Sequence, residues 1–591
     1  MRRERDASVN SYTDMELIRR LFAYFKPQMK RFSIAFFVMI VSVGLDLLLP
    51  YLSGRAIWHL GQSIIEFNKV LILIGIYGVC LALTYVIQYF QTMTLQRAGQ
   101  DIIFNLREEV FTHIEKLSIN QLNAVPVGKM VTRVTSDTNT LNELFTSLLI
   151  NLIRNILTMI GVIIAMFLIN VKLTLIVLAV TPFVFIFSII FRKFSRRAYR
   201  EVRLNVSNIN AFLAENLSGM KITQIFNQES KKLHEFRKRN NDLKHSSFKQ
   251  MFIFGIFRPS IYGLNLLTIM LVLWFGSIDA LTVGIITFDI IYIFYRYIGR
   301  LFNPIQQLAQ EFDVLQSAFA SSERIFTVLD TKPEIVDSPG AIELENIKGE
   351  IEFRNVWFRY IPEEWVLKNV SFKIPAESSV AFVGATGSGK TTILSLIVRN
   401  YDIDKGQILI DGIDIKNIKI SSLRKHIGQM LQDVFLFSGT IFSNIQMRDE
   451  NITIEDVKAA CKYVNADKFI DKLEQGYMEP VRERGNNFSA GQRQLLSFAR
   501  TIVHKPKVMI LDEATANIDT ETELLIQDSL EKMMNIGTMI MVAHRLSTIQ
   551  HADNIIVLQK GEIIEQGNHQ ELLKKRGHYY KLYRLQYEQE K

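Results

Sequence analysis

A glycine-rich stretch at residues 384–391 combines the residue types that hold a phosphate chain. It reads Gly-Ala-Thr-Gly-Ser-Gly-Lys-Thr, the pattern G-x-x-x-x-G-K-[ST]. The apolar run 379–383 before it predicts a strand, and the apolar run 392–398 after it predicts a helix. Glycines let backbone N–H groups close around phosphate oxygens, and a helix N-terminus adds partial positive charge. We therefore predict that this stretch binds a nucleoside triphosphate.

Each residue of this loop has an expected task. Lys390 is expected to reach the β- and γ-phosphates, and the Thr391 hydroxyl is expected to ligate Mg²⁺. The other residues of this region that are expected to contact ATP are Gly384, Thr386, Gly387, Ser388, Gly389 and Thr392. The alternative is a chance glycine-rich turn, but strand, loop, lysine and threonine coincide here.

Further polar and aromatic residues surround the loop in the sequence. The strand-like run 508–511 ends in Asp512, which can hold Mg²⁺ through water, and Glu513, which can polarise an attacking water. His544 can contact the γ-phosphate and keep that water in line with Glu513. Tyr360, ahead of the loop, can stack on an adenine ring. Taken singly, such residues are more often structural, but in this order they predict ATP hydrolysis.

The composition indicates several domains, part of them in lipid. A chain of 591 residues is too long for one hydrophobic core. Apolar residues make up 48%, charged residues only 21%, and the mean hydropathy is +0.14. Two distant cysteines argue against a disulfide framework or a metal cluster. Much of the net charge of +9 flanks apolar segments, which indicates a membrane rather than nucleic acid.

Six apolar stretches are each near the roughly 20 residues that a helix needs to cross a bilayer. They are 32–51, 70–89, 144–169, 173–191, 253–275 and 283–302. The loops after the second and fourth stretches are long and basic, so the positive-inside rule places them and both termini in the cytoplasm. The polar residues 1–14 predict no cleavable signal peptide. Residues 15–27 predict an amphipathic helix in the membrane interface, with an ordinary soluble helix as the alternative.

Ionisable residues inside the spans are costly and are functional candidates. They are Asp46, Arg154, Arg258, Asp289, Arg296 and Arg300. Pairing between helices, or snorkelling to the headgroups, is the alternative role. Asp46 and Arg296, one of each sign, are expected to line a substrate pathway.

The helical pattern ends at residues 331–345, where two prolines and a glycine predict a linker. Beyond it, short β-rich runs alternate with helix-like segments. The expected fold is a membrane all-α domain over residues 1–330, with six transmembrane helices and long cytoplasmic extensions. An α/β P-loop ATPase domain with a helical subdomain is expected over residues 346–591.

The order of these motifs resembles the ATP-binding-cassette (ABC) transporters. Residues 488–492, Phe-Ser-Ala-Gly-Gln, look like the Leu-Ser-Gly-Gly-Gln signature of that family. Six spans ahead of the cassette are similar to the half-transporter exporters of the multidrug and lipid-export type. Residues 128–137 and 215–229 resemble the two cytoplasmic loops that carry coupling helices.

The resemblance implies a dimer with two ATP sites at the cassette interface. Each site would use Tyr360, the P-loop, Gln432, Asp512, Glu513 and His544 of one chain, with Mg²⁺ held by Thr391, Gln432 and Asp512. The signature residues Ser489, Ala490, Gly491 and Gln492 would face the partner's ATP. ATP binding would close the cassettes and open the pathway outward, and hydrolysis would reset it.

Several positions depart from the family pattern, among them Arg482, where exporters often have glycine, and the segment 516–519. Phe488 and Ala490 replace the usual leucine and glycine of the signature, and Asn517 changes the loop that crosses to the other site. With Glu513 intact, this pattern resembles the stronger half of a heterodimeric exporter, and a homodimer is the alternative.

The predicted function is ATP-driven efflux of amphipathic or lipophilic compounds across the cell membrane of a bacterium. Lipid or peptide export and an ATP-gated regulatory membrane protein are the alternatives. A soluble cassette ATPase of DNA repair or translation is opposed by the six spans.

Overall fold

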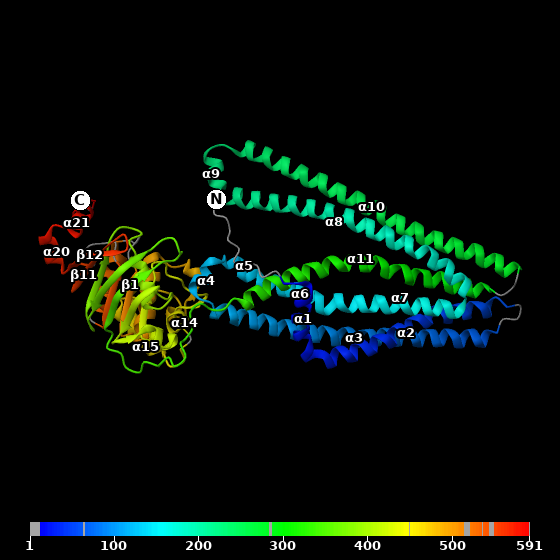
Figure 1. The fold of residues 1–591 in the computed structure, drawn as a ribbon, viewed down its shortest axis with the longest axis horizontal. Coiled ribbons are helices and arrows are strands. Elements are labelled where there is room, and N and C mark those ends of the chain that lie inside the picture. The colour runs from blue at the N-terminus through cyan, green and yellow to red at the C-terminus, as the bar shows by residue number, and fades with distance from the viewer. Residues whose placement is uncertain are drawn as a thin grey trace. The chain divides into compact units, whose positions relative to one another are not determined.

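The computed structural model describes residues 12–62, 66–282, 286–447, 449–512, 520–534, 536–542 and 549–589. The chain divides into two compact units, coloured by residue number in Figure 1. The first comprises Met1–Glu115 and Pro126–Thr331, and the second comprises Lys116–Val125 and Lys332–Lys591. Each unit is built around hydrophobic clusters of its own.

The described part of the first unit is helical. Its α-helices are α1 (Asp14–Phe25), α2 (Met29–Leu60), α3 (Phe67–Lys116), α5 (Val127–Thr132), α6 (Thr138–Glu143), α7 (Leu149–Ile169), α8 (Val171–Ser218), α9 (Met220–Ile225), α10 (Glu229–Thr282) and α11 (Phe288–Asp330). A 3₁₀ turn, η1 (Lys26–Gln28), joins α1 to α2. Two π-helical turns, η2 (Arg133–Asp137) and η3 (Leu144–Leu148), flank α6.

Within the described residues, five helical segments are long and apolar enough to cross a membrane. They are Asp14–Leu60, Phe67–Lys116, Val127–Ile169, Val171–Ser218 and Glu229–Leu281, and they contain the first five predicted spans. The sixth predicted span, 283–302, lies partly outside the described residues and otherwise in α11, whose first turns carry Asp289, Arg296 and Arg300. Helices α3, α8 and α10 have 50, 48 and 54 residues. At about 1.5 Å per residue they exceed the roughly 30 Å of a bilayer core.

Helices α2 and α11 pack closely because of a glycine. A Cβ atom at Gly54 would come within 2.4 Å of Ile293 Cγ1, so only glycine permits this approach. The buried Tyr297 hydroxyl of α11 donates a hydrogen bond to the Leu47 carbonyl oxygen of α2 at 2.7 Å. These contacts fix α2 and α11 against each other in the core of the unit.

Helix α1 is held to the unit by both apolar and polar contacts. Its Leu17 and Leu21 are buried in a cluster with residues of α3 and α11. At the end of α11, Asp330 accepts a hydrogen bond from Arg20 at 2.8 Å and another from the Tyr12 hydroxyl. The Arg20 guanidinium also lies over the Phe326 ring, 4.7 Å from its centroid. The helix expected at residues 15–27 therefore forms, and its placement in a membrane interface stays a prediction.

Two sheets form the frame of the second unit, and they confirm the α/β fold. One is antiparallel, in the order β2 (Leu367–Ile374), β1 (Ile351–Phe358), β4 (Lys405–Ile410) and β5 (Ile413–Asp414). The other has the order β12 (Glu562–Gly567), β11 (Asn554–Gln559), β3 (Ser379–Val383), β10 (Thr538–Val542), β9 (Val508–Asp512) and β6 (Ile427–Met430). Its five strands from β11 to β6 are parallel, and β12 is antiparallel. The strands β3, β9 and β10 are buried throughout, as apolar runs in a parallel sheet should be.

The second unit also contains short helices. They are α4 (Ile119–Ala124), α12 (Lys390–Ile397), α13 (Ile420–Lys425), α14 (Ile441–Gln446), α15 (Ile454–Tyr463), α16 (Asp467–Ile470), α17 (Ala490–Val503), α18 (Thr520–Met533), α20 (His569–Lys575) and α21 (His578–Gln589). A short pair, β7 (Gly439–Thr440) and β8 (Pro480–Val481), lies between them in the sequence. The helices α14, α15 and α17 contact one another in the helical subdomain.

The segment around α4 belongs to the second unit, although the sequence places it between two predicted spans. Its Gln121 amide donates a hydrogen bond to the Lys332 carbonyl oxygen at 2.8 Å. Asn120 donates to the Glu334 carboxylate at 3.1 Å, and Ser118 donates to the same carboxylate at 3.2 Å. These contacts tie α4 to the residues that follow α11.

Candidate functional site

The expected site residues follow the carboxyl ends of neighbouring parallel strands. β3 leads into the glycine-rich loop, β9 ends at Asp512, and Gln432 comes two residues after β6. β10 lies between β3 and β9, with its Val542 paired to Phe382 on one side and Asp512 on the other. Because these strands are parallel, all the groups meet at one edge of the sheet, where ligands of open α/β sheets bind.

The glycine-rich loop connects β3 to α12, as its flanking sequence predicts. The helix begins at Lys390, two residues before the predicted start, so Lys390 and Thr391 lie in its first turn. Gly389 caps the helix with a φ of +107°, and a Cβ atom there would lie 2.7 Å from Leu367 Cδ2. A Cβ atom at Gly384 would lie 2.2 Å from the Leu558 carbonyl oxygen. A side chain at either position would clash with these neighbours, so the loop requires glycine at both positions.

The loop contains two buried hydrogen-bond donors, the Lys390 ammonium and the Ser388 hydroxyl. Lys390 is 8% exposed, and its Nζ donates hydrogen bonds to the carbonyl oxygens of Gly384 at 2.8 Å and Ala385 at 3.1 Å. The Ser388 hydroxyl is buried and has no hydrogen-bond partner within the part of the chain that the structure describes. An unsatisfied buried hydroxyl is costly, and a phosphate oxygen can accept from it. The loop thus fits a phosphate chain by shape and by donor chemistry.

Tyr360 lies beside the first turn of α12. Its hydroxyl forms a hydrogen bond with Thr392 Oγ1 at 3.1 Å, and its ring makes edge contacts with Phe358 and Tyr401 at centroid distances of 4.9 and 5.1 Å. Burial raises the pKa of the Tyr360 phenol, which therefore stays neutral. The side chain is still 44% exposed and lines a cleft of about 260 Å³. This fixed, half-open ring is suited to stacking on a base.

The predicted Mg²⁺ ligands are distributed over three elements. Thr391 is exposed in the first turn of α12, Gln432 is exposed after β6, and Asp512 is 8% exposed at the end of β9. Hydroxyl, amide and carboxylate oxygens are ligands that Mg²⁺ accepts. Among the described residues, no group of three or more His, Cys, Asp or Glu could hold a metal alone. An ion held by Thr391, Gln432 and Asp512 would complete its shell with phosphate oxygens and water.

Glu513, His544 and Asn517 lie outside the described residues. Two of them stand close in sequence to described strands: Glu513 directly follows the last residue of β9, and His544 comes two residues after the last residue of β10. Their roles stay predictions from the sequence.

The signature residues form the N-terminus of α17. Ser489 Oγ accepts a hydrogen bond from the Gln492 N–H at 3.2 Å, and the Ser489 N–H donates to Gln492 Oε1 at 2.9 Å. This capping box leaves the positive end of a 14-residue helix beside an exposed serine. Ala490 takes the first helical position and Gly491 is buried. Phe488 is 6% exposed in the subdomain core, with its ring centroid 6.3 Å from that of Phe469.

The ionisable residues of the spans differ in their partners. Asp46 pairs with Arg300 across α2 and α11 at 3.1 Å, and the buried Asp289 faces Arg55 at 3.7 Å. Arg296 is exposed on α11 and forms no ion pair with any described residue. The side chain of Arg258 lies outside the described part of the chain. Hydropathy alone does not reveal the Asp46–Arg300 pair, because it depends on how α2 packs on α11.

Two family models match the chain. Residues 32–305 match the ABC transporter transmembrane region, and residues 367–516 match the ABC transporter model. An uncharacterized ABC transporter ATP-binding protein of Bacillus subtilis (strain 168) is 41% identical over 96% of this chain and 94% of that protein. From the same organism, a protein named "Probable multidrug resistance ABC transporter ATP-binding/permease protein" is 39% identical over 88% of this chain and 77% of its own length.

A solved structure shares the fold over nearly the whole chain. It is a bacterial Atm1-family ABC exporter with ATP bound, 27% identical to this chain. The match has a TM-score of 0.77 and covers 94% of this chain and 98% of that one.

Proposed function

Because the chain belongs to the ABC transporter family, as an exporter half-transporter that couples ATP hydrolysis to transport, we propose that it expels amphipathic or lipophilic compounds. The observation that carries this proposal is the meeting of the P-loop, Asp512 and Gln432 at one sheet edge. The same chain holds five helical segments of membrane-spanning length within its described residues. A relative named for multidrug resistance supports the cargo class.

We assign the parts of the transporter as follows. Residues 1–330 form the transmembrane domain, although their segment 116–125 belongs to the second compact unit. Residues 331–345 form the linker and 346–591 the ATP-binding cassette. The first coupling helix is expected at residues 128–137, which form α5 and η2, and the second at residues 215–229, which include the short helix α9 between α8 and α10. The basic loops and both termini face the cytoplasm, and the protein lies in the cell membrane of a bacterium.

The cassette binds ATP through the P-loop, with Tyr360 stacked on the adenine ring. The Lys390 ammonium and the Ser388 hydroxyl then donate to phosphate oxygens, and Lys390 exchanges its bonds to the loop carbonyls for them. Thr391, Gln432 and Asp512 would hold Mg²⁺, which neutralises developing phosphate charge when bound. Glu513 accepts a hydrogen bond from the attacking water and so orients it.

The second half of each ATP site comes from a partner chain. The capped N-terminus of α17, with Ser489 exposed, presents N–H groups and partial positive charge to the partner's γ-phosphate. Closure of two cassettes on ATP opens the pathway outward, and hydrolysis by Glu513, aided by His544, resets it. We favour a heterodimer in which this chain supplies the intact glutamate and its partner the unaltered signature, with a homodimer as the alternative.

Arg296 and Asp46 are the proposed pathway residues. Arg296 is exposed at membrane depth and unpaired among the described residues, which is too costly for a lipid-facing arginine and suits a water-filled path or a dimer interface. Asp46 acts through its pair with Arg300, which sets the position of α2 beside that path.

Uptake into inside-out vesicles tests the cargo class. Lipophilic dyes, labelled phospholipids and labelled peptides are supplied in turn, and ATP consumed per molecule moved is counted. The proposal expects dye to accumulate only with ATP, with a small and constant number of ATP molecules hydrolysed per dye molecule transported. Dye movement that needs ATP binding but no hydrolysis would instead indicate an ATP-gated protein, and uptake of peptide alone would exclude the proposed cargo.

A further inference from the structure

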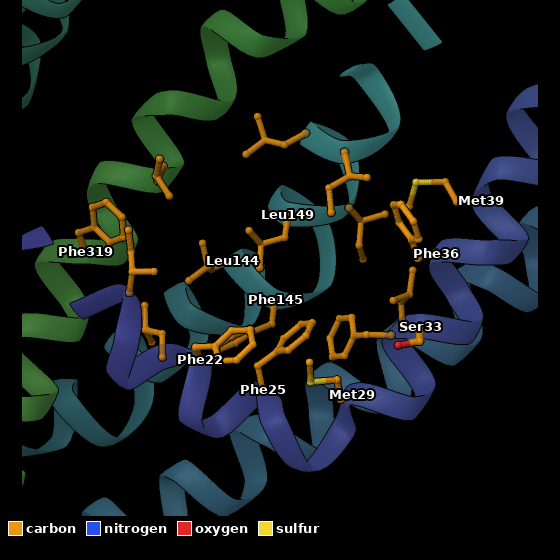
Figure 2. Close-up of a pocket in the computed structure, with 18 residues that line it drawn as sticks. Phe22, Phe25, Met29, Ser33, Phe36, Met39, Leu144, Phe145, Leu149 and Phe319 are labelled. Atoms are coloured by element: carbon orange, nitrogen blue, oxygen red, sulfur yellow. The ribbon is translucent and has the colours of Figure 1, made fainter. Parts of the chain in front are cut away.

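An apolar pocket of about 650 Å³ lies in the first unit, against α1 (Figure 2). Figure 2 shows Phe22, Phe25, Phe36 and Phe145 arranged around it. We propose that this pocket binds an acyl chain of an anionic phospholipid from the cytoplasmic leaflet. The proposed site is separate from the ATP site and from the pathway residues.

The lining suits a hydrocarbon chain. Of the 18 residues that line the pocket, Ser33 alone has a polar side chain. The volume is within the range of cavities that enclose small molecules. Each methylene that leaves water strengthens binding by about fourfold. A polar or charged ligand would find no hydrogen-bond partner along most of this wall.

The wall contains an irregular element. Leu144 and Phe145 line the pocket and belong to the π-helical turn η3, which precedes α7. Thr146 of η3 packs directly against Gly99 of α3, where a Cβ atom would lie 2.2 Å from Thr146 Cγ2. π-helical turns are rare and often mark functional sites. This turn presents Leu144 and Phe145 to the pocket rather than continuing the regular helix.

Basic residues adjacent in sequence to the pocket lining supply the charge complementarity. Arg19, Lys26 and Lys30 are exposed, and each directly follows a residue that lines the pocket. None of the three forms an ion pair with another residue in the described ranges. Arg20 and Arg31, by contrast, are paired with carboxylates. Uncompensated basic residues at the cytoplasmic surface attract anionic headgroups.

The pocket lies at the depth where such a lipid resides. Its lining includes residues from Ile18 in α1 to Met39 in α2, on both sides of residue 32, where the first predicted span begins. The positive-inside rule places this end of α2 at the cytoplasmic face. An acyl chain in the pocket and a phosphate near Lys26 and Lys30 would therefore match one phospholipid of the inner leaflet.

Two paired substitutions separate chain binding from headgroup binding. Ser33→Trp fills the pocket, and Phe37→Trp places the same side chain at an exposed position of α2 that does not line it. Lys26→Gln/Lys30→Gln removes charge near the pocket, and Lys231→Gln/Lys244→Gln removes the same charge from exposed positions of α10. The delipidated full-length assembly is titrated with phosphatidylglycerol and with phosphatidylcholine of identical chains, and bound lipid is counted by native mass spectrometry.

The proposal expects wild type and both controls to bind phosphatidylglycerol about tenfold more tightly than phosphatidylcholine. Ser33→Trp should lose the tight site for both lipids, and Lys26→Gln/Lys30→Gln should lose most of the preference for phosphatidylglycerol. Wild-type binding by either variant, or equal affinity of wild type for the two lipids, overturns it.

A second measurement on the unaltered protein guards against a misfolded variant. Phosphatidylglycerol with a photoreactive acyl chain is expected to label peptides that contain residues 18–39 and 144–153. Labelling confined to other helices overturns the proposal. If these peptides are not labelled, as expected when a helix of the partner chain fills the pocket, the proposal is overturned as well.

Discussion

Lys390 donates a hydrogen bond from Nζ to the carbonyl oxygen of Gly384 at 2.8 Å, within its own loop. The ammonium group is thus held by the backbone at the place where the phosphates are proposed to bind. Because those carbonyl contacts are weaker than contacts to an anionic phosphate, ATP can draw the lysine away without leaving its charge unsatisfied.

Removal of this charge should weaken nucleotide binding itself. Lys390→Ala is expected to lower ATP affinity about 10- to 100-fold, which corresponds to the loss of one or two charge-assisted hydrogen bonds. Equilibrium binding of a fluorescent ATP analogue measures it. Lys405→Ala, at an exposed lysine of β4, is the matched control. Equal affinities of the two variants would refute the assignment of Lys390.

The phenylalanine of the signature should matter for stability. Phe488 is buried against Phe469 in the helical subdomain, so Phe488→Ala should cost about 3–5 kcal/mol of unfolding free energy. Phe488→Leu, the residue that is usual in the family, should cost under about 1.5 kcal/mol. Denaturant unfolding followed by near-UV circular dichroism measures both. A Phe488→Ala variant as stable as the wild type would show that the ring is not part of the core.

Assembly should depend on a second, different chain. Expressed alone, this chain is expected to show weak ATPase activity, and a partner with an unaltered signature should raise it. Size-exclusion chromatography and phosphate release are measured for both preparations. Robust cargo-stimulated hydrolysis by this chain alone would instead establish a homodimer, in which Ala490 is harmless because it retains the backbone N–H.

The pathway residues should separate by their effects. Asp46→Ala and Arg300→Ala are each expected to lower stability, and the double variant should lose less than the sum because both remove one ion pair. Arg296→Ala should alter the transport rate or cargo range and leave the melting temperature unchanged. If Asp46→Ala and Arg296→Ala both leave transport untouched, neither residue belongs to the pathway.

The contact between α1 and α11 should weaken in acid. The hydrogen bond from Arg20 holds the pKa of Asp330 below its usual value, so the folded state favours the ionised carboxylate. Its stabilisation is present above the pKa of the unfolded chain, near 4, and is lost as pH falls through the lower folded value. Both groups are partly exposed, so we expect about 1 kcal/mol or less. Comparison of wild type with Asp330→Asn should show an advantage of the wild type that is smaller at pH 3 than at pH 7, and a constant difference would contradict it.

Local patterns predict the sheet edge well and the helix contacts poorly. The apolar runs and the glycine-rich pattern predict β3, β9 and the loop between β3 and α12, because each of these elements is encoded by adjacent residues. The partner of Asp46 lies 254 residues away in the sequence, and the pocket takes its wall from α1, α2, α3, α7, α11 and the π-helical turn η3. No local pattern carries such contacts. The membership of α4 in the second unit likewise follows from its bonds to Lys332 and Glu334.

Hydrolysis at Glu513 is proposed to drive transport. The direct measurement is ATP turnover together with cargo uptake in reconstituted vesicles, for the wild type and Glu513→Gln with the same partner chain. We expect the variant to retain ATP affinity and to lose turnover by about 10²-fold or more, with uptake falling in proportion. Near-normal turnover in Glu513→Gln, or uptake that persists without hydrolysis, would contradict the claim.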